Sequence, residues 1–271
     1  ANAVSPTGGR LLSAWLLGWQ HVLLSASGLA AASLVGSVIG LAVKRIPHKW
    51  NDIFMGFCAG TMLAAAIVGL LLPAIGQCGL SDWWQVVVGV AAGVALIGTL
   101  DRLTPHLHRL TGLDSERHSA DATTHRVLLF VVAIAIHKLP EGMATGIVFD
   151  ESNLSGAYSV AVSIALQNIP EGMVVVTPLL MIGVGWLRAC GISIVVALLE
   201  MAGVILGFVL GGLSGMFLPG LLGMAGGAML YVISDEMIPE THAHGFQKPA
   251  TYALVAGVTA MLFIDTLTQS L

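Results

Sequence analysis

Two near-copies of one heptapeptide lie inside long apolar stretches of the chain, HKLPEGM at 137–143 and QNIPEGM at 167–173. In each copy a His or Gln precedes a Glu by four residues, so both side chains project from one face of a helix. Together such a pair can bind a cation. Ionised side chains near the centre of a bilayer cost at least about 2.5 kcal/mol on insertion scales and usually mark a pathway for a polar solute. We therefore expect an ion site where the two motifs meet.

Each motif also has a proline directly before its glutamate, Pro140 and Pro170. Proline lacks a backbone N–H, so we expect both helices to kink there and to leave a carbonyl oxygen free for a ligand. An ordinary kink without a role in binding is the alternative. Glu200, alone in the apolar stretch 195–206, adds a third intramembrane carboxylate. A structural hydrogen-bond network is the alternative for the His and Glu pairs, but we favour an ion site because a buried unpaired carboxylate is costly.

The elements that must position these residues are membrane helices. Hydrophobic residues make up 56% of the 271 residues and charged residues only 10%, whereas about 25% are charged in a typical soluble domain. We expect a single all-α, polytopic domain over residues 1–271, located in the cell (inner) membrane. The lipid bilayer is its surrounding partner, and the sequence predicts no nucleic-acid partner.

Eight apolar runs are long enough to cross a bilayer, which takes about 20 residues per helix. They cover residues 20–43, 52–73, 84–100, 126–148, 156–182, 189–212, 217–239 and 250–270. Residues 1–19 form an N-terminal lead-in, and we expect 11–19 to lie at the membrane interface. A short ninth span is the alternative for 11–19.

Basic residues indicate the orientation, because short cytoplasmic loops retain Lys and Arg. The odd-numbered loops contain basic residues and the even-numbered loops contain none. This places the odd loops in the cytoplasm and both termini outside, with Arg10 as the exception. The third loop, 101–125, contains several histidines, which are consistent either with transient metal binding or with the plain tolerance of short polar loops for histidine.

Candidate ligands also follow the apolar part of the seventh span, at its cytoplasmic end. Glu236 and Glu240 share a helical face there, where an ion leaving the centre would emerge. A release site and a solvated helix end are both consistent with this pattern. The residues of this candidate site are Asp235, Glu236, Glu240, His242 and His244.

Taken together, the two motifs resemble those of a known family. H-x-x-P-E-G at 137–142 followed by Q-x-x-P-E-G at 167–172 is similar to the pattern of the Zrt/Irt-like (ZIP) divalent-metal transporters, in particular their bacterial GufA-like branch. The resemblance covers almost the whole chain and implies a transporter, not an enzyme. It implies movement of zinc, and often iron, manganese or cadmium, into the cytoplasm.

The resemblance also implies a site and a cycle. Spans one, four, five and six are thought to slide against spans two, three, seven and eight in an elevator-like motion, and a homodimer is common in the family. The transported ion is bound by the residues that match His137, Glu141, Gln167, Glu171, Glu200 and, in the second span, Met62.

Two positions depart from the pattern of relatives that bind two metals, which have Asn and often Asp where this chain has Lys138 and Asn168. Glu141, Glu171 and Glu200 contribute a charge of −3 and Lys138 contributes +1, and the sum of −2 matches one divalent cation. We therefore predict a mononuclear site in which the Lys138 ammonium takes the place of a second ion beside Glu141. The alternative is that Lys138 extends elsewhere and plays no part.

The ligand types narrow the choice of metal. Imidazole, carboxylate and amide groups suit Zn²⁺, Fe²⁺, Mn²⁺ or Cd²⁺ better than Mg²⁺, and zinc is the first choice. Cys58 lies four residues before Met62 on the same helical face. A thiol near the ion would favour Cd²⁺ or Zn²⁺ over Mn²⁺; a small buried cysteine that only packs the helix is the simpler alternative.

Two other classes of protein bury the same residue types. An intramembrane zinc-dependent hydrolase would need an open water position and usually a His-Glu-x-x-His helix, which the sequence lacks. A proton-driven exchanger of organic solutes could use the carboxylates but has less use for paired His and Glu. Metal transport is therefore the favoured function.

Overall fold

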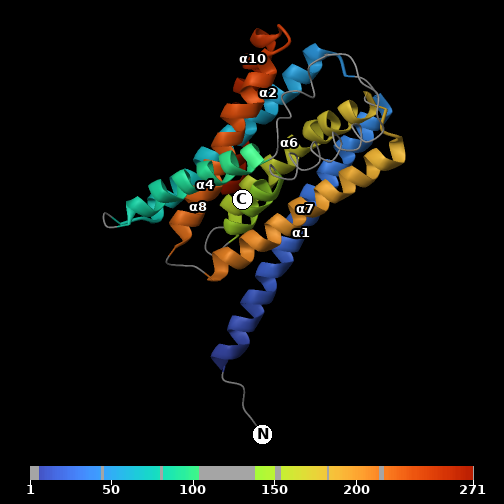
Figure 1. Ribbon diagram of the computed structural model, residues 1–271. Helices are drawn as coiled ribbons and strands as arrows, with labels where there is room; N and C mark the ends of the chain where they lie inside the picture. The colour runs from blue at the N-terminus through green and yellow to red at the C-terminus, as the bar shows by residue number, and fades with distance from the viewer. Residues whose placement is uncertain are drawn as a thin grey trace.

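The computed structural model describes residues 6–43, 46–79, 82–103, 138–149, 154–181, 183–213 and 217–270. Within these ranges the regular secondary structure is helical throughout, as predicted (Figure 1). Residues 138–147 form one helix. The others are α1 (Pro6–Val43), α2 (His48–Ala64), η1 (Ala65–Leu71), α3 (Leu72–Gln77), α4 (Trp83–Leu103), α6 (Leu154–Met181), α7 (Trp186–Leu213), α8 (Leu218–Val232), η3 (Ile233–Met237), α9 (Ile238–His242) and α10 (Gln247–Gln269).

Seven helical segments in the described part of the chain are long and apolar enough to cross a membrane. They are Gly18–Val43, His48–Gln77, Trp83–Leu100, Leu154–Thr177, Trp186–Gly212, Leu218–His242 and Gln247–Thr268. These seven confirm seven of the eight predicted spans to within a few residues. The fourth predicted span, 126–148, is described only from residue 138, and the predicted loop 101–125 only as far as residue 103.

The expected lead-in is helical where it is described. α1 begins at Pro6 and runs without a break to Val43. Residues 6–19 are therefore a continuation of the helix that forms the first span.

Two short π-helical segments occur where the sequence predicted ordinary α-helix. η1 is followed by α3, whose second residue is Pro73, and η3 is followed by α9, whose second residue is Pro239. Proline cannot donate a backbone hydrogen bond to the preceding turn, and a wider turn is one way for a helix to accommodate it. By contrast, the helix 138–147 continues through Pro140 and α6 continues through Pro170. The kinks expected at those two prolines stay a prediction.

Four helices pack with their backbones almost in contact: α1, the helix 138–147, α6 and α7, here called the first helix group. A Cβ atom added to Gly36 of α1 would lie 2.0 Å from the carbonyl oxygen of Ile169 in α6. One added to Gly142 would lie 2.2 Å from the carbonyl oxygen of Glu200 in α7. Glycine at such crossings lets membrane helices approach closely, so a side chain at either position would push two helices apart.

The second helix group contains α2 with η1 and α3, α4, α8 with η3 and α9, and α10. α2 lies beside α10, and α4 lies beside α8 (Figure 1). The same kind of packing joins each pair: a Cβ added to Gly60 of α2 would lie 2.0 Å from the carbonyl oxygen of Leu254 in α10. One added to Gly227 of α8 would lie 2.4 Å from that of Val90 in α4.

The boundary between the two helix groups is made by side chains. Where an added Cβ on a described glycine would meet backbone atoms, those atoms belong to a helix of the same group. Gly69 in η1 faces across the boundary, and the atom it meets is in the side chain of Val160 in α6. A side chain can rotate where a backbone cannot move, so the boundary deforms more easily than the interior of either group.

Candidate metal site

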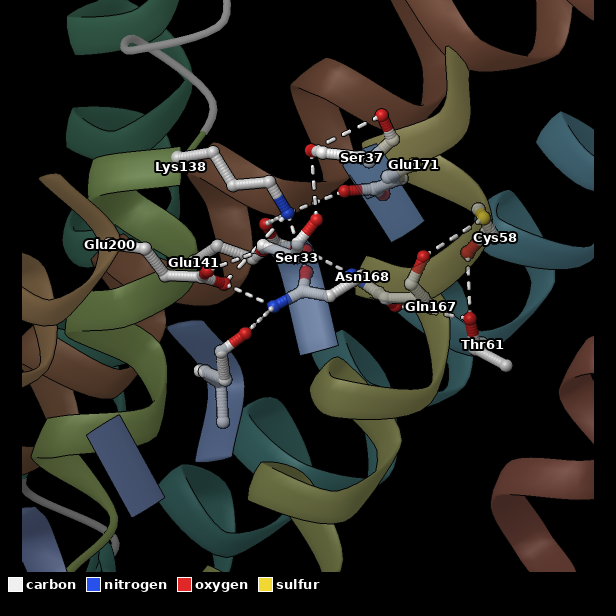
Figure 2. Close-up of polar contacts among 12 residues, drawn as sticks. Ser33, Ser37, Cys58, Thr61, Lys138, Glu141, Gln167, Asn168, Glu171 and Glu200 are labelled. Carbon is white, nitrogen blue, oxygen red and sulfur yellow. Dashed lines mark hydrogen bonds and ion pairs between the residues drawn. The ribbon is translucent and has the colours of Figure 1, made fainter. Parts of the chain in front are cut away.

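The centre of the first helix group contains three carboxylates that converge on one lysine. Lys138 is only 4% exposed. Its Nζ atom donates hydrogen bonds to Glu141 Oε2 at 2.7 Å and to Glu171 Oε2 at 2.5 Å. Glu200 Oε1 lies 3.8 Å from the same nitrogen (Figure 2). The ion pair between Lys138 and Glu141 that the sequence predicted is therefore present, and Lys138 also contacts the other two acids.

Asn168 joins the lysine to Glu200. Its Oδ1 atom accepts a hydrogen bond from Lys138 at 2.5 Å, and its Nδ2 atom donates to Glu200 Oε1 at 2.7 Å. The same Nδ2 donates to the backbone carbonyl of Leu29 in α1 at 3.3 Å. An amide can serve a cation and an anion at once because it has both a donor and an acceptor. Asn168 therefore connects α6 to α1, to α7 and to the helix 138–147.

α1 contributes a side chain that the sequence did not single out. Ser33 donates a hydrogen bond to Glu200 Oε2 at 3.0 Å, so both oxygens of this fully buried carboxylate have a donor. Ser25, Ser33 and Ser37 are all buried on α1 at spacings of eight and four residues, which place them on one face. A row of serines at helical spacing in an apolar span was the signal that could have found Ser33.

Gln167 lies between the two helix groups. Its Nε2 atom donates a hydrogen bond to Glu141 Oε1, and its Oε1 atom accepts one from the Thr61 hydroxyl at 3.0 Å. The Cys58 thiol donates to the main-chain carbonyl of Gln167 at 3.5 Å. Figure 2 shows Gln167 with Glu141 on one side and with Thr61 and Cys58 of α2 on the other. Thr61 was also missed, because a lone threonine in an apolar span carries no specific signal.

The remaining predicted ligands are placed as follows. Met62 is buried in a large apolar cluster made mostly by the second helix group, next to Thr61 in sequence. The side chain of Glu171 is 14% exposed, the most open of the three acids. His137 lies outside the described residues. In the described part of the chain no group of three or more His, Cys, Asp or Glu side chains is disposed to bind a metal ion; the three acids are instead gathered around Lys138.

The candidate release site is spread over three short elements. Asp235 and Glu236 belong to η3, Glu240 and His242 to α9, and His244 to the turn before α10. The His242 Nδ1 atom lies 2.8 Å from the carbonyl oxygen of Ile238, within its own helix. Within the described part of the chain, no three of these five side chains form a group that could hold a metal ion.

His244 instead contacts α2. Its Nδ1 atom lies 3.0 Å from Asp52 Oδ1, and its ring stacks on that of His48 with 4.5 Å between centroids. Asp52 is fully buried, and the sequence analysis did not single it out. An acid one turn after His48 at the start of an apolar span was the available signal.

The comparisons with known proteins agree with this architecture. A family model described as ZIP zinc transporter matches residues 102–265, more than half of the chain. The chain belongs to the ZIP family. The zinc transporter ZIPB of Bordetella bronchiseptica is 37% identical over 252 residues, which cover 90% of this chain and 80% of ZIPB. The zinc transporter GufA of Myxococcus xanthus is 35% identical over 251 residues, which cover 88% of this chain and 98% of GufA.

A third relative extends the same result. The zinc transporter ZupT of Corynebacterium glutamicum is 32% identical over 251 residues, which cover 87% of this chain and 93% of ZupT. The resemblance inferred from the two motifs is thus confirmed. Membership of the ZIP family does not support the alternative of an intramembrane hydrolase.

Proposed function

We propose that this ZIP-family protein transports divalent transition-metal ions, zinc in the first place, into the cytoplasm. The observation that carries the proposal is the convergence of Glu141, Glu171 and Glu200 inside helices that are long enough to cross a membrane. Carboxylates so deep in an apolar protein are costly unless a cation neutralises them. With Gln167 beside them and His137 four residues before Glu141, they supply the oxygen and nitrogen ligands that suit zinc.

The site binds one ion at a time. The three acids carry −3 and Lys138 carries +1, so one divalent cation brings the sum to zero. The Lys138 ammonium lies within hydrogen-bond distance of both Glu141 and Glu171, and so occupies the space where a second ion would bridge them. A second divalent ion would have to displace an ammonium that these two carboxylates and Asn168 already bind.

The transport cycle is a sliding motion of the first helix group against the second. Support comes from the packing: glycines bring backbones together within each group, whereas side chains form the boundary between the groups. The charged residues of the site all belong to the first group and would move with it. The ion then leaves toward the cytoplasmic ends of α2 and α9, where Asp52, Glu240 and His244 lie.

The orientation proposed with this cycle follows from the basic residues. Both termini are outside, and the odd-numbered loops are in the cytoplasm. Seven described spans and the predicted span 126–148 give the even number of crossings that this arrangement requires.

Zinc flux into proteoliposomes tests the function. We expect time-dependent uptake of ⁶⁵Zn²⁺ by the wild type, with organic solutes not transported. Glu171→Gln keeps the side-chain shape but removes one ligand charge, and His137→Ala removes the imidazole; each should lower uptake at limiting zinc by at least about tenfold. Asp82→Asn, an exposed acid outside the spans, is the matched control and should retain wild-type uptake. Uptake by the wild type that does not exceed that of empty liposomes would refute the function.

A further inference from the structure

The carboxamide of Gln167 has both of its ends engaged, and each end contacts a different helix group. Its nitrogen donates to Glu141 Oε1 in the first group, and its oxygen accepts from Thr61 in the second group. The nitrogen end must be the one that faces the carboxylate, because two oxygens in contact would repel. The orientation of this amide is therefore fixed by its two neighbours.

A metal ion requires the opposite orientation. An amide binds a cation through its oxygen, since the nitrogen carries two hydrogens and offers no lone pair. For Gln167 to share an ion with Glu141, its oxygen must turn toward Glu141, to where the nitrogen now lies. That turn withdraws the oxygen from Thr61. Binding of the ion and the hydrogen bond from Thr61 to Gln167 thus exclude each other.

We infer that Thr61 is a positioning residue that joins the two helix groups when the site is empty and releases them when Gln167 binds the ion. The inference rests on the proposed transport function and adds a coupling between occupancy and motion. Side-chain hydrogen bonds across the boundary also run from Cys58 to the main-chain carbonyl of Gln167 and from Ser163 to Met261. The Thr61 bond differs from these two because it ends on the Gln167 carboxamide, so it is the bond that turning the amide breaks.

The Thr61 hydroxyl has a hydrogen-bond acceptor both when the site is empty and after Gln167 has turned to bind the ion. Thr61 Oγ1 lies 2.9 Å from the carbonyl oxygen of Cys58 in its own helix, so its proton has an acceptor after Gln167 has turned. Loss of the link therefore does not leave a buried donor without a partner, which would otherwise oppose the turn.

Zinc binding by the purified full chain in lipid nanodiscs tests the inference. Thr61→Val removes the hydroxyl at almost constant volume and so removes the bond that competes with the ion for Gln167. We expect its dissociation constant for Zn²⁺, measured by calorimetry, to fall about two- to tenfold, the range for one hydrogen bond. Thr61→Ser keeps the hydroxyl and should restore the wild-type value. Thr177→Val, at a buried threonine of α6 that bonds only to its own helix, is the matched control.

Cross-linking across the boundary gives a second readout. In a chain with Cys78→Ser and Cys190→Ser, the pair Ser163→Cys and Met261→Cys reports on contact between α6 and α10, with molecular iodine as the oxidant. Zinc should slow cross-linking several-fold when Thr61 is present, and Thr61→Val should slow it without zinc.

Each result has a distinct meaning. If Thr61→Val binds zinc no more tightly than Thr61→Ser, or if its cross-linking rate matches that of the parent without zinc, the inference is wrong. If the wild type also fails to carry ⁶⁵Zn²⁺ into liposomes, the proposed function itself is wrong. Wild-type flux together with equal zinc affinity of the two Thr61 variants would remove only the coupling.

Discussion

The two helix groups contribute different chemistry to the site. The first group supplies every charged side chain there, Lys138 with its three acids, and these neutralise one another in part. The second group contributes the neutral side chains of Cys58 and Thr61. A charge that crossed the boundary would tie the groups together with an ion pair in a low-dielectric interior, where such pairs are strong. In the proposed sliding motion the first group would pass the uncharged side chains of Cys58 and Thr61 at the site.

The packing within the helix groups also differs from the packing between them. Within each group, glycines place backbone against backbone, and across the boundary side chains meet side chains. The charged residues of the site and the described glycine contacts between backbones therefore both lie inside the groups. In the proposed cycle this packing would let each group move as a unit along the boundary.

The largest expected effect comes from changing the charge inside the first group. Lys138→Asn leaves Glu141, Glu171 and Glu200 without their cation, and loss of one partner of a buried ion pair typically costs about 3–5 kcal/mol. We expect a much less stable metal-free protein in chemical unfolding, with stability restored by zinc. We also expect the bound metal, measured by mass spectrometry of the purified protein, to rise from one ion per chain to two.

Lys248→Asn, at an exposed lysine near the start of α10, provides the matched control and should change neither quantity. One ion per chain in Lys138→Asn, with unfolding like that of the wild type, would show that Lys138 does not stand in for a second ion.

How much of this arrangement the sequence predicts depends on the range of the forces involved. Seven spans were predicted well because the length of an apolar run is a local property that the bilayer thickness fixes. The ion pair of Lys138 with Glu141 was predicted for a similar reason, since residues three apart on a helix are neighbours. The π-helical segments η1 and η3 were missed because hydropathy carries no information on hydrogen-bond register.

Contacts between distant helices could not be predicted in the same way. Ser33 and Thr61 reach the site only because α1 and α2 pack against α6. Glycines bring α1 and α6 together, whereas side chains meet between α2 and α6, and the sequence indicates the partner in neither case. At the predicted release site the same limit applies: His244 contacts Asp52, which is 192 residues away in the chain, and helical spacing cannot indicate such a partner. Small hydroxyl residues are common in membrane helices, so their spacing alone is a weak signal.

A smaller effect is expected from the glycine packing within the first group. Gly36→Ala puts a methyl group against the carbonyl of Ile169 and should lower the midpoint of thermal unfolding, because overpacking typically costs about 1–3 kcal/mol. Gly28→Ala on the same helix meets nothing within 4 Å and should leave the midpoint unchanged or raise it slightly. Gly69→Ala, which meets only the Val160 side chain, should fall between them. Equal midpoints for Gly36→Ala and Gly69→Ala would contradict the contrast between group interior and boundary.

The smallest expected effect concerns the choice between metal ions at the uncharged side chains that α2 contributes to the site. The Cys58 thiol already donates to the Gln167 carbonyl, so it lies beside a predicted ligand and is the softest group near the site that α2 offers besides Met62. Cys58→Ala should lower the ratio of Cd²⁺ to Mn²⁺ uptake in a competition assay in proteoliposomes, because a thiol favours the softer ion. Cys190→Ala, at a half-buried cysteine near the start of α7, is the control. If the two variants give the same ratio, Cys58 only packs the helix, and selectivity resides entirely in the first helix group.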